Sequence, residues 1–535
     1  MTVPAHRPVR LVRSRLRIAA AALAAATAAT LTTGPLGAVA AATTRPDLLP
    51  ACVYGASATG LRGYESRVQH DAWAYADGLS GSSAAQKLSA ARTFAAGEAA
   101  YVYGLPLVDL HDTVRRFKFR NTLVSVAKLS TPATKNVVSP NVDTAYTVGW
   151  LSLTQGPLVV DVPDTAGRFY TFQFMDAFTN SFHYLGSGST GTKAGSYLFA
   201  PPGWSGDVPA GVHVVHSPTR TMWLLGRTLV HEDADAERVK PLLEKYTVTP
   251  LDAWKVGVRG RSVVFDNAPP QPQKTPIPQG TDFVATLNQE TTIDPPPATQ
   301  ACVLTALAPA GVTPPDTTPG AAAAADTLNA AGNPPGSPAD TPQNRAVRAG
   351  TAAAVHLVAG AADRYRASTS AGNRGWSVMT DPWIGDFGRQ YLGRAVIATD
   401  LLGANRPRIA TYPTSYRDGR GRLLNGRHRY TITFPKGQLP PVRAFWSLTM
   451  YKSDNYLYAN TIGRYAVGDR TRGLRRNADG SLTVYLQHAR PQGAKARANW
   501  LPAPAGSFHL ILRLYLPQRA ALDGSYRIPP FVQVG

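Results

Sequence analysis

Hydrophobic residues recur with two different periods along this chain. Between residues 83 and 104, Ala, Leu, Phe and Tyr stand three or four positions apart, and the stretch ends at Gly104, shortly before Pro106. This spacing predicts an α-helix that ends at Gly104. From Leu123 to Val230 the apolar positions instead alternate or form short runs separated by Gly, Pro, Asp and Asn. Several short strands at this spacing predict a β-sandwich or a β-barrel.

The same two periods return in the second half of the chain. Residues 388–405 carry apolar side chains at helical spacing, and Gly403 is suited to cap that helix. Later, the two-residue alternation reappears in RYTITF, AFWSLTMY, SLTVYLQ and FHLILRLYL, which predicts a second β-module. Between about residues 255 and 350, Pro, Ala, Thr and Gly dominate. This composition predicts a loose connection with short helices at 283–288 and 302–307.

The first forty residues have the composition of an export signal. Arginines precede an apolar, Ala-rich stretch from Ile18, and Ala38-Val39-Ala40 matches a signal-peptidase site. We therefore expect cleavage near Ala40 and a secreted or extracytoplasmic mature chain, with an uncleaved membrane anchor as the alternative. No later segment has the roughly 20 continuous apolar residues of a membrane span.

The positive charge of the chain suggests the kind of partner it meets. The formal net charge is +21, and loss of the five arginines of the signal would leave about +16. Such a charge favours anionic partners, which for an exported chain would be envelope polymers. Because no predicted helix carries a basic stripe, we do not expect nucleic-acid binding.

The chain contains two cysteines, Cys52 and Cys302. In an exported protein a disulfide between them would close a long loop and restrict the unfolded chain. The sequence alone leaves open whether the two residues meet. Two thiols are too few for a thiolate metal site or an iron–sulfur cluster.

The common catalytic signatures are missing from the sequence. There is no G-x-S-x-G elbow, and His231-Glu232 is not followed by a second histidine at zinc-protease spacing. Gly186, Gly188 and Gly191 spell G-x-G-x-x-G, but no amphipathic helix follows, so a glycine-rich loop is the better interpretation. The sequence therefore predicts no nucleotide cofactor and leaves the reaction, if any, unknown.

The segment SPNVDTAYT, residues 139–147, places several polar residues directly before a predicted strand. Asn141 and Asp143 favour turns that start the strand near Tyr146. Alternatively, these side chains project from the rim of a sandwich and bind a ligand. Asp176, close to Asn180, could add a second carboxylate, and two converging acids would suit acid–base catalysis or a hard cation such as calcium.

A second candidate segment is AFWSLTMYKSDNYLYANTIGRY, residues 444–465. In a strand, Phe445, Ser447, Thr449 and Tyr451 face one way, whereas Trp446, Leu448 and Met450 face the other. The face with hydroxyls could line a groove; a strand packed on both faces is the alternative. The predicted ligand-binding set is Asn141, Asp143, Tyr146, Asp176, Trp446, Tyr451, Asn455 and Arg464.

Longer motifs resemble two families that usually occur together. YVYGLPLVDL, SPNVDTAYT and RFYTFQFMDAFTN are similar to the bacterial domain-of-unknown-function family 1254, whereas HRYTITFPKGQLPPVRAFWSLTMY and NWLPAPAGSFHLILRLYLP resemble family 1214. The resemblance implies an immunoglobulin-like sandwich, a helical segment and then a jelly-roll sandwich. It supplies no reaction. Residues 265–350 are richer in Pro and Ala than the helical middle that the resemblance implies.

These observations predict a mainly β fold with a helical middle segment. The expected parts are a signal peptide (1–40), an N-terminal extension (41–84), a first β-sandwich (85–250), a Pro/Ala-rich connection with short helices (251–425) and a jelly-roll domain (426–535). We expect an exported protein that binds, and in one version hydrolyses, a small or polymeric envelope ligand in a groove between the two β domains. The alternative is a non-catalytic wall-associated protein that uses its basic surface.

Overall fold

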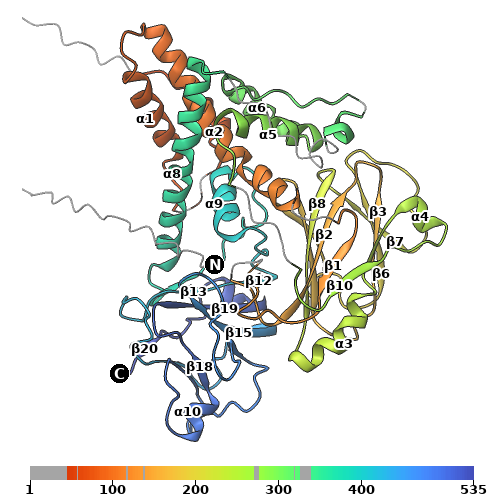
Figure 1. Cartoon of the computed structure of the whole chain (residues 1–535), viewed down its shortest axis with the longest axis vertical. Helices are drawn as coiled ribbons and strands as arrows, with labels where there is room; N and C mark the ends of the chain where they lie inside the picture. Colours follow the sequence, from red (N-terminus) through yellow and green to blue (C-terminus); the bar gives the residue numbers. More distant parts are fainter. Residues whose placement is uncertain are drawn as a thin grey trace, which may run out of the picture. The chain divides into compact units, whose positions relative to one another are not determined.

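The first β-module consists of two facing sheets with a shared apolar core (Figure 1). In the computed structural model the six-stranded sheet has the order β10 (Ser262–Phe265), β1 (Leu123–Val126), β2 (Thr144–Ser152), β8 (Thr221–Leu229), β4 (Tyr170–Asp176), β5 (Ser181–Gly186). Strand β2 pairs with β8, β8 with β4, and β10 runs parallel to β1 at the sheet edge. The four-stranded sheet has the order β7 (Val212–His216), β6 (Gly195–Ala200), β3 (Leu158–Val162), β9 (Thr247–Pro250), and the helices α3 (Asp233–Leu243) and α4 (Leu251–Lys255) accompany it.

The structure describes residues 45–56, 58, 60–115, 119–135, 139–269, 276–318, 320–325 and 339–535. The predicted signal segment, residues 1–40, lies outside the described residues, and so does the predicted cleavage site. By their contacts, Asp47–Gly535 form one unit. Both sandwiches and the helices between them belong to this unit.

The second β-module also pairs two sheets around an apolar core. Trp446, Leu448 and Met450 point into this core, and Phe445, Ser447 and Tyr451 lie on the other face, as the alternation predicted. One sheet has the order β11 (Trp376–Ser377), β13 (Thr414–Ser415), β19 (Phe508–Pro517), β15 (Val442–Lys452), β16 (Ala466–Gly468), with β12 (Ala410–Thr411) also on β19. The other has the order β18 (Trp500–Pro502), β17 (Leu482–Gln487), β14 (Tyr430–Phe434), β20 (Val532–Gln533), and the short helices are α10 (Ala494–Ala498) and α11 (Arg519–Leu522).

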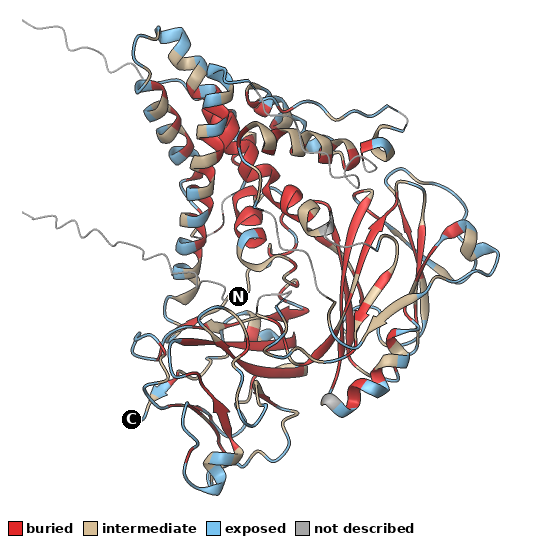
Figure 2. Ribbon diagram, viewed as in Figure 1, coloured by how far each residue is buried: buried red, intermediate tan, exposed pale blue. Residues whose placement is uncertain are grey.

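A helical layer with its own apolar core accompanies the two sandwiches. Its central helix, α2, is the most continuously buried helix in Figure 2. Small residues let α2 and α8 approach closely, because a Cβ on Gly350 would lie 2.2 Å from the carbonyl oxygen of Phe94. The helices are α1 (Tyr64–Asp77), α2 (Ala84–Arg115), α5 (Gly280–Ile293), α6 (Ala301–Leu307), α8 (Pro342–Ser370) and α9 (Tyr391–Leu401), with 3₁₀ turns η1 (Ala51–Val53), η2 (Ala298–Gln300) and η3 (Ala308–Ala310).

The prediction that the first helix ends at Gly104 is wrong. Helix α2 continues through Pro106 to Arg115. Proline removes a backbone hydrogen bond, but Leu105 and Leu107 beside it are buried in the helical core. This burial offsets the lost hydrogen bond. A rule that considers only neighbouring residues in the sequence cannot account for burial in a tertiary core.

The prediction that the Pro/Ala-rich connection at residues 251–425 contains short helices is wrong over α8, a helix of 29 residues. Half of its ten buried residues are Ala or Gly, so the apolar periodicity is weak. The start of the helix does carry a signal, because Thr341 caps it by accepting a hydrogen bond from the backbone N–H of Asn344, and Pro342 follows directly. The helix expected within 388–405 is confirmed as α9.

Cys52 in η1 and Cys302 in α6 form a disulfide that joins residues 250 positions apart. The bond attaches the N-terminal turn to the segment that follows α5. The neighbouring turn is held by a second contact, in which Tyr103 Oη donates to Gln300 Oε1 at 2.7 Å. Among the described helices, none has both the length and the apolar character needed to cross a bilayer.

Candidate functional site

The loop before β2 lies against the second sandwich. Tyr451 Oη donates to the carbonyl oxygen of Pro140 at 2.7 Å, and Arg513 Nη2 donates to that of Ser139 at 2.6 Å. Ser447 Oγ donates to the Asp143 carboxylate at 2.5 Å. We call this contact between loop 139–146, the adjoining face of β8, and the facing sides of β15 and β19 the seam. The seam brings together segments that are about 300 residues apart in the sequence.

Asn141 shapes the loop from within. Its Oδ1 accepts hydrogen bonds from the backbone N–H groups of Asp143 at 2.9 Å and Thr144 at 2.8 Å, and its Nδ2 donates to Tyr146 Oη at 2.5 Å. These are the turn contacts that the sequence suggested as one alternative. Asn141 is buried, and its polar atoms are engaged inside the protein.

Asp143 connects the two sandwiches through an ion pair with Arg470, in which the carboxylate is buried and the guanidinium is partly exposed. The Arg470 guanidinium also donates to the carbonyl oxygen of Val230 at 3.4 Å and lies 4.3 Å from the ring centre of Phe445. With Ser447 as a further donor, the carboxylate has partners on both of its oxygens. Asp143 therefore holds the first sandwich to the second.

Replacing Asp143 by Asn is expected to lower the free energy of unfolding by about 1.5 to 3 kcal/mol, because it removes the charge to which Ser447 and Arg470 donate hydrogen bonds. Denaturant unfolding of the variant measures the loss. The matched control is Asp454→Asn, which removes an exposed ion pair with Lys452 and should cost less than about 1 kcal/mol. Equal losses in both variants would contradict the structural role of Asp143.

Two further arginines are buried in the seam without a carboxylate. Arg513 Nη1 donates to Thr449 Oγ1 at 3.2 Å, in addition to its bond to the loop. Arg227 on β8 makes only long contacts, at 3.3 Å to Gln173 Oε1 and 3.5 Å to the Gly403 carbonyl oxygen. Within the described part of the chain neither guanidinium forms an ion pair. The seam thus contains two buried cations that form no ion pair among the described residues: tyrosines surround Arg227, and Arg513 also lies within the electrostatic influence of the Asp143 carboxylate.

Tyrosine hydroxyls surround the two arginines. Tyr146 stands directly opposite Arg227 across the β2–β8 ladder, and its ring centre lies 5.9 Å from the guanidinium. Burial raises the pKa of Tyr515 well above its usual value and also raises that of Tyr184. These phenols therefore stay protonated and neutral near pH 7, so the seam keeps its positive charge.

The seam reaches the protein surface through tyrosines. Tyr146 and Tyr412 are partly exposed, whereas Arg227 and Arg513 are buried behind them. Tyr412 Oη accepts from Asn405 Nδ2 at 2.7 Å, and Asn405 Oδ1 is buried without a hydrogen-bond partner among the described residues. The two tyrosines therefore bring the seam close to solvent.

The expectation that Asp176 and Asp143 converge is wrong. Asp176 pairs with Met222 at one end of β8, whereas the strand that Asp143 precedes begins opposite Leu229 at the other end. Asp176 instead accepts from Asn180, at 2.8 Å from its N–H and 2.9 Å from Nδ2. Burial raises the pKa of Asp176 to about 6.

Three other predicted ligand-binding residues make contacts within the protein. Trp446 packs inside the second sandwich, with its ring 5.3 Å from that of Phe434. Arg464 donates to the carbonyl oxygens of Ala498 at 2.7 Å and Trp500 at 3.0 Å, outside the seam. Asn455 reaches the seam through its backbone, because its carbonyl oxygen accepts from the N–H of Ser139 at 2.8 Å.

Arg227, Arg513 and Arg470 are not among the site residues that the sequence predicted. The first two are single charges within the otherwise apolar strands TMWLLGRTL and FHLILRLYLP. A lone arginine in such a strand is unusual, because a charge is almost never fully buried without a partner. That signal could have identified both residues. In the described part of the chain, no three His, Cys, Asp or Glu side chains are grouped so that they could hold a metal ion.

Together, these features define a protein of two β-sandwiches joined by a polar seam and accompanied by a helical layer. Residues 120–250 match the family described as Protein of unknown function (DUF1254). Residues 409–519 match the family described as Protein of unknown function (DUF1214). The predicted resemblance, including the order of the two families, is confirmed.

A solved structure supports the fold. The chain is similar to the crystal structure of the VPA0106 protein from Vibrio parahaemolyticus, with 23% identity over 83% of this chain and 100% of that chain and a TM-score of 0.59. It also matches a crystal structure of an uncharacterized protein from Burkholderia cenocepacia, with 12% identity over 88% of this chain and 94% of that chain and a TM-score of 0.38. No curated protein matches the chain.

Proposed function

We propose that this protein binds a compact organic anion at the seam, between Arg227 and Arg513. The observation that carries the proposal is the pair of buried guanidinium groups without a carboxylate partner. A buried charge is costly unless it is paired and hydrogen-bonded. A carboxylate or phosphate group would pair these charges and accept hydrogen bonds from the surrounding tyrosine hydroxyls.

The arrangement supports binding rather than the hydrolysis that the sequence left open. A carboxylate that acts as a general base must be free to take a proton from a substrate within its reach. Asp143 accepts from Ser447 and is paired with Arg470, so both of its oxygens are engaged. We therefore assign Asp143 to the support of the site and assign the anion to the two arginines.

We further propose that the protein works outside the cytoplasm. The Cys52–Cys302 disulfide supports this location, because such bonds persist mainly in oxidising compartments. An immunoglobulin-like first sandwich and a jelly-roll second sandwich remain part of the proposal, and the paired sheets around two cores support it. The alternative of a wall-associated protein with a basic surface stays a prediction.

Arg227→Met tests the proposed function. Replacing a buried charge by an apolar side chain of similar volume is often neutral or stabilising, so we expect the variant to keep or raise its Tm without ligand. Citrate, succinate and inorganic phosphate, each at constant ionic strength, should raise the Tm of the original protein. A ligand at 100 times its Kd stabilises by about 2.7 kcal/mol, and Arg227→Met should lose this gain.

Arg394→Met is the matched control. Arg394 is equally buried, but it lies in the helical layer and donates to the carbonyl oxygen of Tyr103 at 2.9 Å. The Tm of this variant should still rise when an anion is added, even if its Tm without ligand differs from that of the original protein. An unchanged response in Arg227→Met, or no response to any of the three anions in the original protein, would overturn the proposal.

A further inference from the structure

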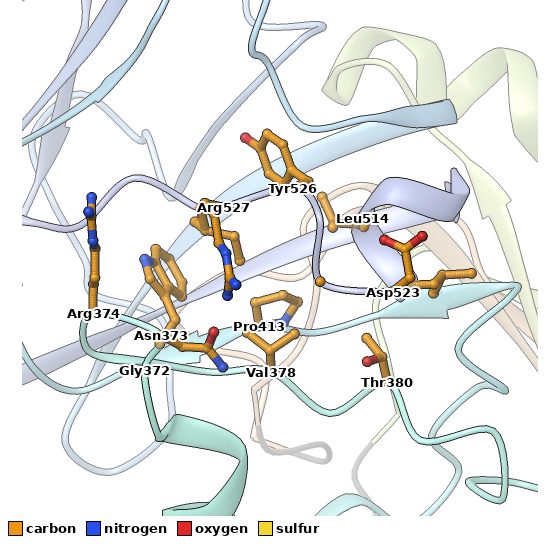
Figure 3. A pocket seen from close by; sticks show the side chains of 15 residues that line it. Gly372, Asn373, Arg374, Val378, Thr380, Pro413, Leu514, Asp523, Tyr526 and Arg527 are labelled. Atoms are coloured by element: carbon orange, nitrogen blue, oxygen red, sulfur yellow. The ribbon is translucent and has the colours of Figure 1, made fainter.

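A cavity of about 380 Å³ lies between the end of α8 and the loop that follows α11 (Figure 3). In Figure 3, Arg527 extends towards the middle of the labelled side chains, and Arg374 and Asp523 stand on opposite sides. The cavity therefore has charged groups around its edge. Its apolar lining comes from Trp376, Val378, Pro413, Leu514 and Ile528.

The cavity walls are fixed by contacts on two sides. Trp376 Nε1 donates to the carbonyl oxygen of Pro529 at 2.9 Å, and its ring lies 4.9 Å from that of Phe531. Tyr526 Oη donates to the carbonyl oxygen of Gln438 at 3.1 Å. These bonds hold the C-terminal loop in place, so the cavity is formed before any ligand arrives.

The charged edge of the cavity is mainly positive. Arg374 and Arg527 are exposed, and within the described part of the chain neither has a hydrogen bond or ion pair. Asp523 is engaged, because it accepts from Ser525 Oγ at 2.7 Å and from Arg519 Nε at 3.3 Å. The two guanidinium groups are therefore available to an anion.

The backbone at Arg374 is strained. Its φ is +50°, in the left-handed region, and φ is +93° at the adjacent Gly375. A residue with a Cβ is strained in this region, and glycine is not. Glycine at position 374 would therefore fit with less strain, which makes a change to glycine a useful test of the arginine side chain.

We propose that this cavity binds an amphipathic carboxylate. The alkyl chain would cover the apolar lining, and the carboxylate would lie between Arg374 and Arg527. This site is independent of the seam: Leu514 lines the cavity from one face of β19, and its neighbour Arg513 faces the seam from the other.

Isothermal titration with three probes tests the proposal. Octanoate carries both an alkyl chain and a carboxylate, octanol carries only the chain, and acetate carries only the charge. Octanoate should bind at least about tenfold more tightly than either of the others, since a charged hydrogen bond is worth that much. Equal binding of octanol and octanoate would overturn the role of the arginines, and no binding of octanoate would overturn the site.

Arg374→Gly separates a ligand role from a structural one. Because glycine relieves the strain, we expect its Tm to be unchanged or higher, together with an about tenfold weaker affinity for octanoate. Ala166→Gly is the matched control: Ala166 is exposed at a similar φ of +51° in a distant loop, so its change should leave octanoate binding intact. Unchanged octanoate affinity in Arg374→Gly would contradict the proposal.

Two more variants complete the experiment. Arg527→Gln should also weaken octanoate binding about tenfold. If Arg374→Gly lowers the Tm, its weaker binding could have a structural cause, and the affinity of Arg527→Gln then tests the role of the arginines. Arg227→Met in the seam should leave octanoate binding unchanged. If Arg227→Met abolishes octanoate binding and Arg527→Gln does not, the carboxylate binds at the seam and the cavity proposal fails.

Discussion

Replacing Glu98 by Gln is expected to stabilise the protein at pH 8 and to reduce the dependence of its stability on pH. Glu98 lies on α2 where α8 crosses it, is fully buried, and has no hydrogen-bond partner on either carboxylate oxygen among the described residues. Burial, with a smaller contribution from Asp71, raises its pKa from 4.5 to about 8, against the opposing effect of Arg67.

The direction in which stability changes with pH follows from the protonation of Glu98 in the folded and unfolded states. Between pH 4.5 and about 8 the folded protein keeps Glu98 protonated, whereas the unfolded chain is ionised. The favourable contribution is therefore complete below pH 4.5 and is lost as pH rises towards 8. At about 1.4 kcal/mol for each pH unit, the loss approaches about 5 kcal/mol, and the neutral amide of Gln avoids it.

Denaturant unfolding at several values between pH 5 and pH 8.5 measures this effect. Asp294, whose pKa burial raises to about 7, adds a slope of the same sign, so Glu98→Gln should flatten the profile and not abolish it. Glu237→Gln, on the exposed side of α3, is the control and should follow the original profile. If the stability of Glu98→Gln depended on pH in the same way as that of the original protein, Glu98 would not be held protonated.

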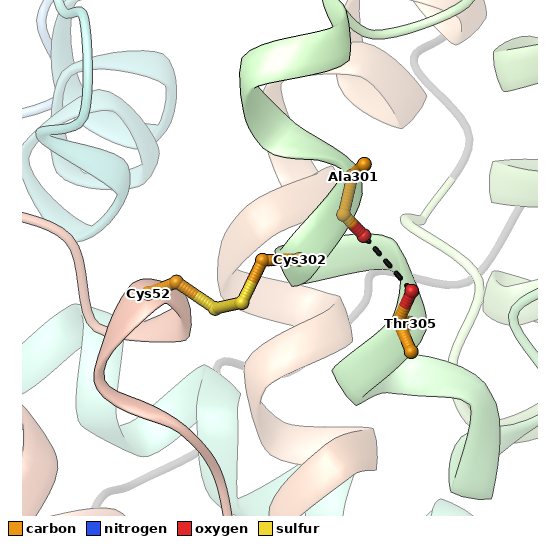
Figure 4. The surroundings of a disulfide bond; sticks show 4 residues. All are labelled: Cys52, Ala301, Cys302 and Thr305. Carbon is orange, nitrogen blue, oxygen red and sulfur yellow. Dashed lines mark hydrogen bonds between the residues drawn. A yellow bond between two sulfur atoms is a disulfide. The ribbon is translucent and has the colours of Figure 1, made fainter.

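Removing the disulfide is expected to lower the free energy of unfolding by about 5 kcal/mol. The bond between Cys52 and Cys302 closes a loop with a sequence separation of 250 residues (Figure 4). A cross-link over so long a loop removes much of the conformational entropy of the unfolded chain. The double variant Cys52→Ser, Cys302→Ser should therefore unfold at a markedly lower denaturant concentration.

Reduction of the original protein gives the same comparison without a mutation. Dithiothreitol should lower the stability of the original protein to that of the double variant and should leave the variant unchanged. A loss below about 1 kcal/mol in both experiments would indicate that the unfolded chain is already restricted near these residues.

Much of the β architecture could be predicted from the sequence, because the two-residue period reports directly on which face of a strand is buried. The orientation of residues 445–451 is an example: Trp446 enters the core and Ser447 faces the seam. Helix α8 was missed because half of its buried residues are Ala or Gly, which pack closely without a strong apolar pattern.

The candidate site was predicted in part, and the error has a geometric cause. Residues 139–146 and Tyr451 do meet, but Asp176 lies at the far end of the sheet. Strands β2 and β4 both run antiparallel to β8, so they share one direction, and the start of one is remote from the end of the other. Strand order is a long-range property, and no local spacing in the sequence reveals it.

The parallel pairing of β10 with β1 matters for anyone who wishes to produce the first sandwich separately. The DUF1254 match ends at residue 250, whereas β10 spans Ser262–Phe265. A fragment that stopped at the family boundary would expose the backbone N–H and C=O groups of β1, and unpaired edges of this kind recruit other chains and aggregate. Extending such a fragment to Asp266 retains the protecting strand and the ion pair between Lys240 and Asp266.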